Sequence, residues 1–354
     1  MGNSVLTPSI RKNEDLLDSY TPKKKINDLR YGECTLLQAK SNKDFVIMKE
    51  ITINTYKDYL ETLSKWESRL KLEHPNILQL VGLCTKEESQ YCSKFYKIFL
   101  LFEYIKSDLD EEIQSKKQKN TPFSKDEMTF LIFCCVSALF YYQKCNSAHE
   151  DVRSASVFVS QSGVYKLVEH SFFNGPSSFM QVQFNLDRSH TGVYLSPQLM
   201  ESLGKARPSH KSVKSDVFAF GMVILETGLL EKLDDCYDFK ESKILWNNIE
   251  EKLEEFKKRF PGWISTVVKG MLKEKEDERM DFGEILGRLK ISDELKKDKR
   301  FEEVKKKKKP KKIHIFPLKL NRYPRVFSVT SKEAENFKKL TVKLSIIILL
   351  MFIN

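Results

Sequence analysis

The sequence predicts an α+β protein in which a β-rich first part precedes a mainly helical second part. Over residues 26–105, short apolar runs of strand length alternate with polar segments, and one helical pattern interrupts them. Over residues 106–289, apolar residues recur mainly at helical spacing. With 354 residues and a hydrophobic fraction of 41%, the chain is long enough for one large domain or two ordinary ones with a packed core.

The first part contains runs that are typical of strands. Residues 45–51 form a short apolar run with a single lysine, FVIMKEI, and further strands are predicted at NILQLVGLC and KIFLLFEY. Residues 55–72 are predicted to form a helix, because apolar residues recur at steps of three and four. The recurring residues are Tyr56, Tyr59, Leu60, Leu63, Trp66 and Leu70.

The second part opens on a strong helix pattern. Ser124 and, three residues later, Glu127 match a capping box, so we expect a helix over residues 124–142. Two short strands joined at Ser162 and Gly163 are predicted from the run SVFVSQSGVYKLVEH. Residues 212–289 are mainly helical in pattern.

The net charge of +11 is concentrated near the C-terminus. Residues 290–325 hold 15 Lys and Arg against 5 Asp and Glu, residues 326–354 carry a further net charge of +2, and residues 1–289 are nearly neutral. We therefore expect residues 290–354 to form a basic, largely disordered extension, and residues 1–25 a flexible polar N-terminus. The apolar end, Leu344–Ile353, is shorter than the ~20 residues that span a bilayer.

The basic run Lys305–Lys312, KKKKKPKK, allows several interpretations. Such a run is typical of a solvated tail, of a nuclear import signal, and of a segment that makes weak contact with nucleic acid or an anionic membrane. Seven scattered cysteines without a CxxC pattern indicate free thiols in a reducing compartment. Because no apolar run stands near the start, we expect a cytoplasmic protein, with the nucleus as a second location if the basic run acts in import.

Seven short segments, in order and at fitting separations, resemble the protein kinase superfamily, and its tyrosine-kinase-like branches more than others. They are HPNILQLVGLC (74–84), LLFEY (100–104), HEDVRSASVFV (149–159), YKLVEHSF (165–172), VYLSPQLM (193–200), KSDVFAFGMVILE (214–226) and DERMDFGEIL (277–286). The resemblance covers residues 26–289. It implies a two-lobed kinase-like fold, with a β-rich N-lobe at residues 26–105 and a mainly helical C-lobe at residues 106–289.

The resemblance also implies a site for ATP and Mg²⁺. Lys49 stands at the phosphate-binding lysine, Asp151 at the residue that accepts the proton of the substrate hydroxyl, and Arg153 at the basic residue of the catalytic loop. Glu169 and Ser156 stand at the two metal-ligand positions. The ATP slot is implied to be lined by Leu36, Ile47, Phe102, Glu103, Tyr104 and Phe158.

Several positions around the implied nucleotide hold residues that the family does not use. Leu29, Tyr31 and Cys34 stand where a glycine-rich loop would approach the phosphates, and their side chains argue against a tight cradle. Ile47 and Phe158 are bulkier than the alanine and leucine that usually enclose the base. Since packed interiors resist added volume, we expect ordinary ATP affinity to be lost.

The implied metal ligands are altered as well. Glu169 is one methylene longer than the usual aspartate, which is a handicap under the near-ideal octahedral geometry that Mg²⁺ requires. Ser156 is a shorter and poorer ligand than the usual asparagine. The helix partner of the phosphate-binding lysine is open: the expected position holds Lys65, and Glu61 or Glu67 could take the role only if the helix shifts.

Two further substitutions and one retained aspartate bear on regulation and architecture. Glu150 replaces the arginine that grips an activation-segment phosphate, and its carboxylate would repel one. Gln198 replaces the glutamate that pairs with the C-lobe arginine, Arg279, so a hydrogen bond is expected in place of an ion pair. Asp216 is expected to accept backbone N–H bonds from the catalytic loop and to keep that loop in place.

These observations favour a pseudokinase that serves a signalling complex as a scaffold or allosteric binding module, with proteins as its partners. The first alternative is a divergent active kinase that transfers the ATP γ-phosphate to Ser, Thr or Tyr, with Lys49, Asp151 and Glu169 as its machinery. The second is an adaptor that uses its basic tail on nucleic acid or an anionic membrane.

Overall fold

The computed structural model describes most of the chain before residue 290 and four residues after it. The described residues are 9–10, 15–28, 32–90, 93–173, 176–186, 190–205, 207–289, 298, 300–301 and 304. All of them belong to the first of two compact units, residues 1–309. The basic run and the apolar end, Leu344–Ile353, lie outside the described residues.

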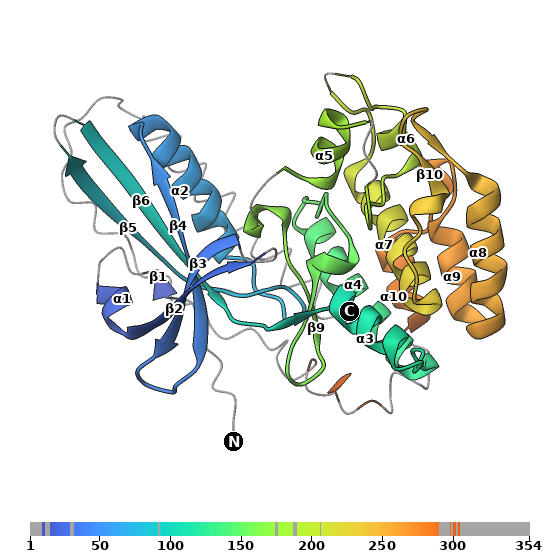
Figure 1. Ribbon diagram of the computed structural model, residues 1–354, viewed down its shortest axis with the longest axis horizontal. Coiled ribbons are helices and arrows are strands. Elements are labelled where there is room, and N and C mark those ends of the chain that lie inside the picture. The colour runs from blue at the N-terminus through green and yellow to red at the C-terminus, as the bar shows by residue number, and fades with distance from the viewer. Residues whose placement is uncertain are drawn as a thin grey trace, which may run out of the picture. The chain divides into compact units, whose positions relative to one another are not determined.

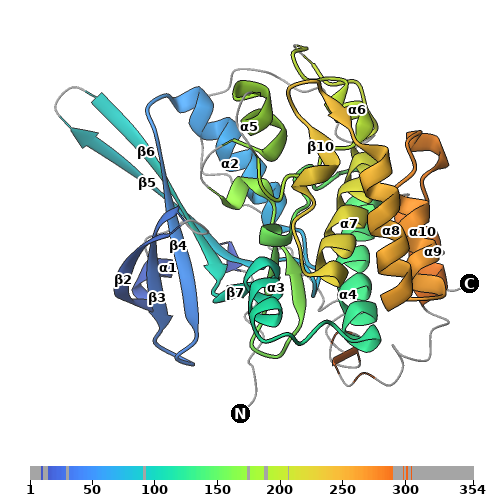
Figure 2. The same ribbon diagram turned by 45° about the vertical axis from the view of Figure 1, so that its right-hand side comes forward.

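The first lobe is a six-stranded sheet with one long helix, α2 (Tyr56–Leu70), against it (Figure 1 and Figure 2). The strand order is β1-β5-β6-β4-β3-β2, with antiparallel neighbours except for the parallel pair β1 and β5. The strands are β1 (Ser9–Ile10), β2 (Tyr20–Asp28), β3 (Gly32–Ala39), β4 (Phe45–Ile53), β5 (Leu80–Gln90) and β6 (Ser93–Glu103).

Helix α2 and the sheet build the first apolar core. Thr55 begins the helix, because its side chain accepts a hydrogen bond from the backbone N–H of Asp58. Trp66 and Leu70 point from the helix to the sheet, and Trp66 meets Phe102 of β6 edge to face at 5.9 Å. Of the predicted apolar face, Trp66 and Leu70 are buried, whereas Tyr56 and Leu60 are 58% and 46% exposed, so the face is buried only towards the C-terminal end of α2.

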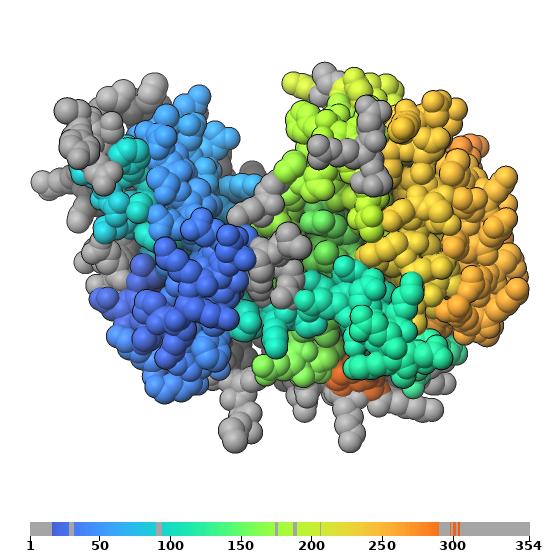
Figure 3. Space-filling view, in the orientation of Figure 1, coloured from blue at the N-terminus to red at the C-terminus, as the bar shows by residue number. Residues whose placement is uncertain are grey.

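The second lobe is mainly helical (Figure 1). Its long helices are α3 (Leu109–Gln118), α4 (Lys125–Lys144), α7 (Ser212–Leu229), α8 (Trp246–Arg259), α9 (Trp263–Met271) and α10 (Phe282–Leu289). The shorter elements include α5 (Ser178–Phe184), α6 (Pro197–Met200) and a small sheet of β7 (Ser107–Asp108), β8 (Val157–Val159) and β9 (Tyr165–Leu167). In the space-filling view the sheet lobe is blue and the helical lobe runs from green to orange (Figure 3).

Helices α4 and α7 form the centre of the second lobe, since most of their side chains are buried. The predicted capping box begins α4: the Ser124 hydroxyl accepts from the Glu127 N–H, and the Glu127 carboxylate accepts from the Ser124 N–H. The predicted α+β, two-lobed architecture is confirmed. Within the described part, no helix is both long and apolar enough to cross a membrane.

The N-terminal boundary differs from the sequence prediction. Residue 26 falls inside β2, which pairs with β3 from Tyr20 to Asp28, so the sheet begins before the expected domain start. Leu16 of α1 (Asp15–Asp18) is also buried, against the face of the sheet that α2 does not cover. The polar character of β2 hid this strand, because exposed lysines on an edge strand are compatible with sheet pairing.

The C-terminal boundary differs in the same way. Phe301 and Val304 belong to the core of the helical lobe, although they lie in the stretch expected to be a disordered extension. A charge-rich composition predicted disorder there, but two apolar residues three positions apart suffice to bury one side of a short segment.

Two glycines in helices give a matched test of core packing. A Cβ at Gly228 of α7 would lie 2.7 Å from Phe256 Cδ2 and 3.0 Å from Phe260 Cε2, whereas a Cβ at Gly287 of α10 would meet nothing within 4 Å. We expect Gly228→Ala to lower the free energy of unfolding by about 1–3 kcal/mol through overpacking. Gly287→Ala is expected to raise it by about 0.5–1 kcal/mol, since alanine favours helix. Urea denaturation measures both, and equal effects would contradict the packing of α7 against α8.

Candidate functional site: a filled nucleotide slot

The residues implied to bind a nucleotide come together between the sheet and the segment that follows β9. Leu36, Ile47, Phe102 and Phe158 share one buried cluster. Cys34 also belongs to this cluster, while Leu29 and Tyr31 lie outside the described residues. The structure therefore brings the two faces of the implied slot together, as the sequence predicts.

The ring of Phe172 fills this slot. Phe172 is fully buried and meets the Phe102 ring edge to face at 4.9 Å and the Phe158 ring at 5.9 Å. Phe173 packs beside it, with ring centroids 5.6 Å apart. Ile47 and Phe102 have no exposed surface and Phe158 only 1%. In an interior packed at crystal-like density, such an aromatic cluster leaves no room for a base between its members.

Lys49 of β4 is engaged by the same phenylalanine. Its Nζ donates a hydrogen bond to the Phe172 carbonyl oxygen and lies 4.7 Å from the centroid of the Phe172 ring. Burial lowers the pKa of Lys49 to about 8. The lysine that would hold phosphates thus contacts the segment that occupies the slot.

Helix α2 reaches the site through Arg69, which the sequence interpretation missed. The Arg69 side chain is 7% exposed and its guanidinium forms an ion pair with the Glu169 carboxylate. Arg69 Nη2 lies 3.3 Å from Glu169 Oε2 and donates to the Leu78 carbonyl oxygen at 2.5 Å. The signal was available, because Arg69 lies three residues after Trp66 and therefore on the apolar face of the helix.

The glutamates considered for pairing with Lys49 lie elsewhere on the helix. Glu61 is exposed and Glu67 is half-buried, and Lys65, at the expected position, is also exposed. The α2 side chain that does reach the site is cationic, and its partner is Glu169, the implied metal ligand.

Ser156, the second implied metal ligand, is committed to its own turn. The Ser156 hydroxyl donates to the Arg153 carbonyl oxygen at 2.8 Å and accepts from the Arg153 N–H at 3.0 Å. Among the described residues, no group of three or more His, Cys, Asp and Glu side chains is arranged to hold a metal ion. The side chains present do not fit Mg²⁺-bound ATP, because Phe172 occupies the slot and both implied ligands are engaged by the protein.

The Asp151 carboxylate is also bound by the chain itself. Asp151 Oδ1 accepts from the N–H of Ser178, at the start of α5, at 3.2 Å. Oδ2 faces His170 Nδ1 at 3.3 Å and Arg153 Nε at 3.6 Å. Burial alone would raise the pKa of Asp151, but the hydrogen bond with His170 and the charge of Arg153 outweigh it and lower the pKa to about 2.

Asp216 of α7 holds the loop that carries Asp151. Its Oδ2 accepts from the N–H of His149 at 2.7 Å, and its Oδ1 accepts from the N–H of Glu150 at 2.9 Å. The backbone at Glu150 is left-handed, with φ of 65°, a conformation that non-glycine residues adopt at a cost. Burial raises the pKa of Asp216 to about 7. The two hydrogen bonds fix the strained turn and fit the architectural role expected for this aspartate.

The hinge positions serve structural contacts. Glu103 Oε1 accepts from the Gln79 N–H at 2.8 Å and from Lys166 Nζ at 2.5 Å, so it joins β6 to β9. Tyr104 meets Phe45 edge to face, with ring centroids 6.4 Å apart.

Gln198 and Arg279 make the hydrogen bond that the sequence suggested. Arg279 is 2% exposed and its Nη2 donates to Gln198 Oε1 at 2.6 Å. The same guanidinium donates to the backbone carbonyls of Lys273, Lys214 and Glu274 at 2.7, 3.0 and 2.8 Å. Burial lowers the pKa of Arg279 to about 10. The Arg279 guanidinium is therefore bound by the Gln198 amide oxygen and backbone carbonyl oxygens, which are neutral, in place of the glutamate carboxylate that the family uses.

This fold and site define a protein kinase domain in which the catalytic positions are recognisable. The family model described as "Protein kinase domain" matches residues 20–288, most of the chain. The chain belongs to the protein kinase family.

Curated relatives of the chain include a protein named as an inactive kinase and a protein named as a kinase. It is 28% identical over 184 residues to the inactive serine/threonine-protein kinase BKN2 of Arabidopsis thaliana, covering 49% of each chain. It is 21% identical over 250 residues to the dual specificity protein kinase shkE of Dictyostelium discoideum, covering 68% of this chain and 31% of that one. The chain thus spans half or less of the length of these relatives, which together support the family and leave activity open.

The Arg69–Glu169 pair gives a test of the buried charges. Arg69→Met leaves the Glu169 carboxylate buried without its cation, and we expect the free energy of unfolding to fall by about 3–5 kcal/mol. The double variant Arg69→Met/Glu169→Leu removes both charges and is expected to recover most of that loss. Chemical denaturation measures both, with Lys257→Met in the exposed Glu254–Lys257 pair as a control that changes stability by less than about 1 kcal/mol. Purely additive losses in the double variant would contradict a coupled pair.

His149 gives a test by pH. It is buried, its Nε2 lies 3.0 Å from the Val168 carbonyl oxygen, and burial lowers its pKa to about 4. The unfolded state, with a histidine pKa of about 6.5, therefore binds the proton first, and the folded state loses stability as pH falls from 6.5 towards 4. The destabilisation caused by His149→Gln is expected to be about 2 kcal/mol smaller at pH 5 than at pH 7.5.

Urea denaturation of the wild type and the His149→Gln variant at pH 5, 7.5 and 9 measures this difference. The values at pH 7.5 and 9 serve as the control, because His149 is neutral in both states there. A difference that stays constant from pH 5 to 9 would contradict a buried neutral imidazole.

Proposed function

We propose that this protein is a pseudokinase, a protein kinase fold that serves a signalling complex as a scaffold or allosteric binding module for other proteins. The observation that carries the proposal is the position of Phe172, whose buried ring lies among Phe102, Phe158 and Lys49, where the family would bind the nucleotide. Entry of an adenine ring would require Phe172 to leave this cluster and to give up its contact with Lys49.

The chemistry of the remaining catalytic positions supports the same proposal. A general base works best when its pKa lies near the operating pH, and the Asp151 carboxylate has a pKa of about 2. Its oxygens face Ser178 and His170, so it binds α5 and the segment after β9 to the loop. Glu169 would have to leave Arg69 before it could ligate a metal, and a buried arginine would then lose its counter-charge.

The divergent active kinase is the first alternative, because Lys49 and Asp151 are retained at their family positions. The adaptor that acts through its basic tail is the second, and it depends on Lys305–Lys312, outside the described residues. We place the protein in the cytoplasm, with the nucleus as a second location if this run acts as an import signal.

Thermal denaturation with ATP, with and without Mg²⁺ or Mn²⁺, tests the filled slot. We expect wild-type Tm to change by less than about 1 °C at millimolar ATP, since a ligand stabilises only a state that binds it. Phe172→Ala is expected to have a lower Tm than the wild type. Unlike the wild type, this variant is expected to show a rise in Tm when nucleotide is added. Phe184→Ala is the control, because this phenylalanine is 68% exposed. A metal-dependent stabilisation of the wild type would contradict the proposal.

A phosphotransfer assay separates the pseudokinase from the divergent kinase. We expect wild type and Asp151→Ala to give the same background signal on protein substrates. Activity that is present in the wild type and absent in Asp151→Ala would establish the divergent kinase instead.

For the adaptor, binding to DNA or anionic vesicles that persists after deletion of residues 310–354 and neutralisation of Lys305–Lys309 would exclude the tail as the cause.

A further inference from the structure

Four residues beyond α10 are described, and all four contact the helical lobe or one another. Phe301 is 7% and Val304 1% exposed, and both belong to the core of this lobe. The Phe301 ring meets the Phe133 ring of α4 edge to face, with centroids 4.8 Å apart. The family match ends at residue 288, so these contacts lie outside the part of the chain that the kinase family model describes.

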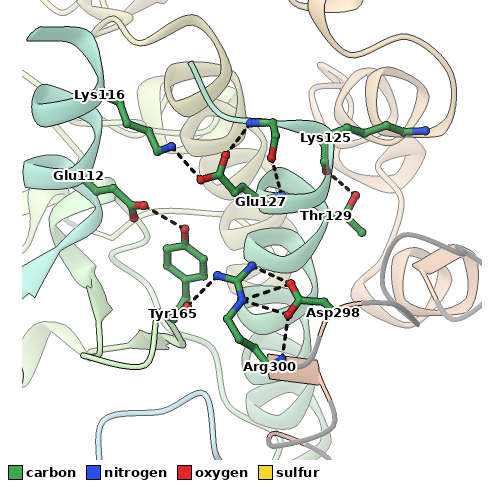
Figure 4. Close-up of polar contacts among 10 residues, drawn as sticks. Glu112, Lys116, Lys125, Glu127, Thr129, Tyr165, Asp298 and Arg300 are labelled. Carbon is green, nitrogen blue, oxygen red and sulfur yellow. Dashed lines mark hydrogen bonds and ion pairs between the residues drawn. The ribbon is translucent and has the colours of Figure 1, made fainter. Parts of the chain in front are cut away.

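Arg300 lies between α4 and the turn that joins β8 to β9 (Figure 4). Its guanidinium carbon lies 4.1 Å from the centroid of the Phe130 ring, and Nη1 donates to the Gly163 carbonyl oxygen at 3.4 Å. The Asp298 carboxylate accepts from Arg300 Nη2 at 2.7 Å and from Nε at 3.1 and 3.2 Å. These hydrogen bonds orient the planar guanidinium against the Phe130 ring.

The turn is shaped for this arginine. Gly163 has a φ of +72°, which an L side chain rarely adopts, and a Cβ there would lie 3.3 Å from Arg300 Nη1. In β9, the Tyr165 hydroxyl donates to Glu112 Oε1 at 3.5 Å (Figure 4). Burial raises the pKa of both groups, and the charge of Arg300 opposes that rise. A glycine and a buried aromatic face thus make a place for one guanidinium.

We propose that α4 and the β8–β9 turn form a docking groove for a strap of this chain's own sequence, which is defined by the described residues Asp298, Arg300, Phe301 and Val304. The occupant is the chain's own segment, because its anchoring side chains, Arg300, Phe301 and Val304, are seated there. This goes beyond the proposed function, because the contacts of the described strap residues are with Phe130, Phe133 and Gly163 and do not depend on whether the protein binds ATP.

The strap also stabilises the strand that leads to the site. Arg300 binds the turn at Gly163, and β9 (Tyr165–Leu167) runs from that turn towards Glu169. Release of the strap removes a contact at one end of β9, while the Arg69–Glu169 pair remains at the other. We therefore expect local opening of β9 to become easier when the strap is weakened, in contrast to helices that the strap does not touch.

Charge-matched and size-matched variants of the full-length chain test the strap. Arg300→Ala/Phe301→Ala is expected to lower Tm by about 5–10 °C through the loss of a buried phenylalanine and of the cation–π contact of the half-buried Arg300. The control is Arg288→Ala/Phe184→Ala, which removes the same side-chain types from exposed positions and is expected to change Tm by less than about 2 °C. Equal changes in the two variants would overturn the proposal.

Hydrogen exchange supplies a second readout that a general loss of stability would not reproduce. In Arg300→Ala, amides of residues 163–168 are expected to exchange about tenfold faster than in Arg288→Ala, while amides of α8 exchange alike in both. Uniformly faster exchange over the whole domain, or no change at β9, would overturn the coupling of the strap to β9. This comparison also serves if the double variant does not fold.

Rescue in trans tests the groove itself. A synthetic peptide of residues 295–309, added to the Arg300→Ala/Phe301→Ala variant, is expected to raise its Tm by several degrees, because a ligand that binds only the folded state stabilises it. A control peptide with Arg300→Lys and Phe301→Ala keeps the charge and is expected to have no effect. Equal effects of the two peptides would show binding by charge alone and overturn the proposed groove.

Discussion

The buried ion pair between Arg69 and Glu169 is the contact on which the arrangement of the site depends. It joins the end of α2 to the segment after β9 across the boundary between the sheet and the helical lobe. With Glu169 held against the helix, the chain turns so that Phe172, three residues later, enters the slot and places its carbonyl oxygen on Lys49. A buried charge requires a partner. Arg69 and Glu169 supply one for each other, and the Phe172 carbonyl oxygen supplies one for Lys49.

Residues at the catalytic-loop positions, and Asp216 of α7, make hydrogen bonds that stabilise the fold. Asp151 binds the start of α5, Ser156 closes the turn at Arg153, and Asp216 holds the left-handed backbone at Glu150. Each of these polar groups is buried, so losing its partner would leave an unsatisfied donor or acceptor inside the protein. This gives a physical reason for the kinase-like catalytic loop to keep its geometry whether or not the domain is active.

Much of the fold could be predicted from sequence, because periodicity and capping are local. The helices α2 and α4 follow from apolar spacing and, for α4, from the capping box at Ser124, and their ends lie within two residues of the predicted ranges 55–72 and 124–142. The ends of the domain could not be predicted in this way. In the sequence alone, an edge strand with exposed lysines such as β2 has the composition of a polar tail. A strap held by two apolar residues and one arginine has the composition of a charged tail.

The bulk of Ile47 and Phe158 indicated a narrowed slot, and the structure places both residues in one buried cluster with Phe172. The sequence did not indicate the pairing of Arg69 with Glu169. That Phe172 fills the space could not be read from the sequence, because it depends on the path of the chain between Glu169 and Phe173. The place of Arg69 on the apolar face of α2 follows from helical spacing, whereas its pairing with Glu169 depends on the tertiary structure.

A slot filled by a covalently attached ring behaves differently from one filled by a diffusing ligand. The effective concentration of Phe172 at the slot is fixed by the chain and does not change with the metabolic state of the surroundings. On the proposed function, such a domain would present the same surface to its protein partners at any ATP concentration.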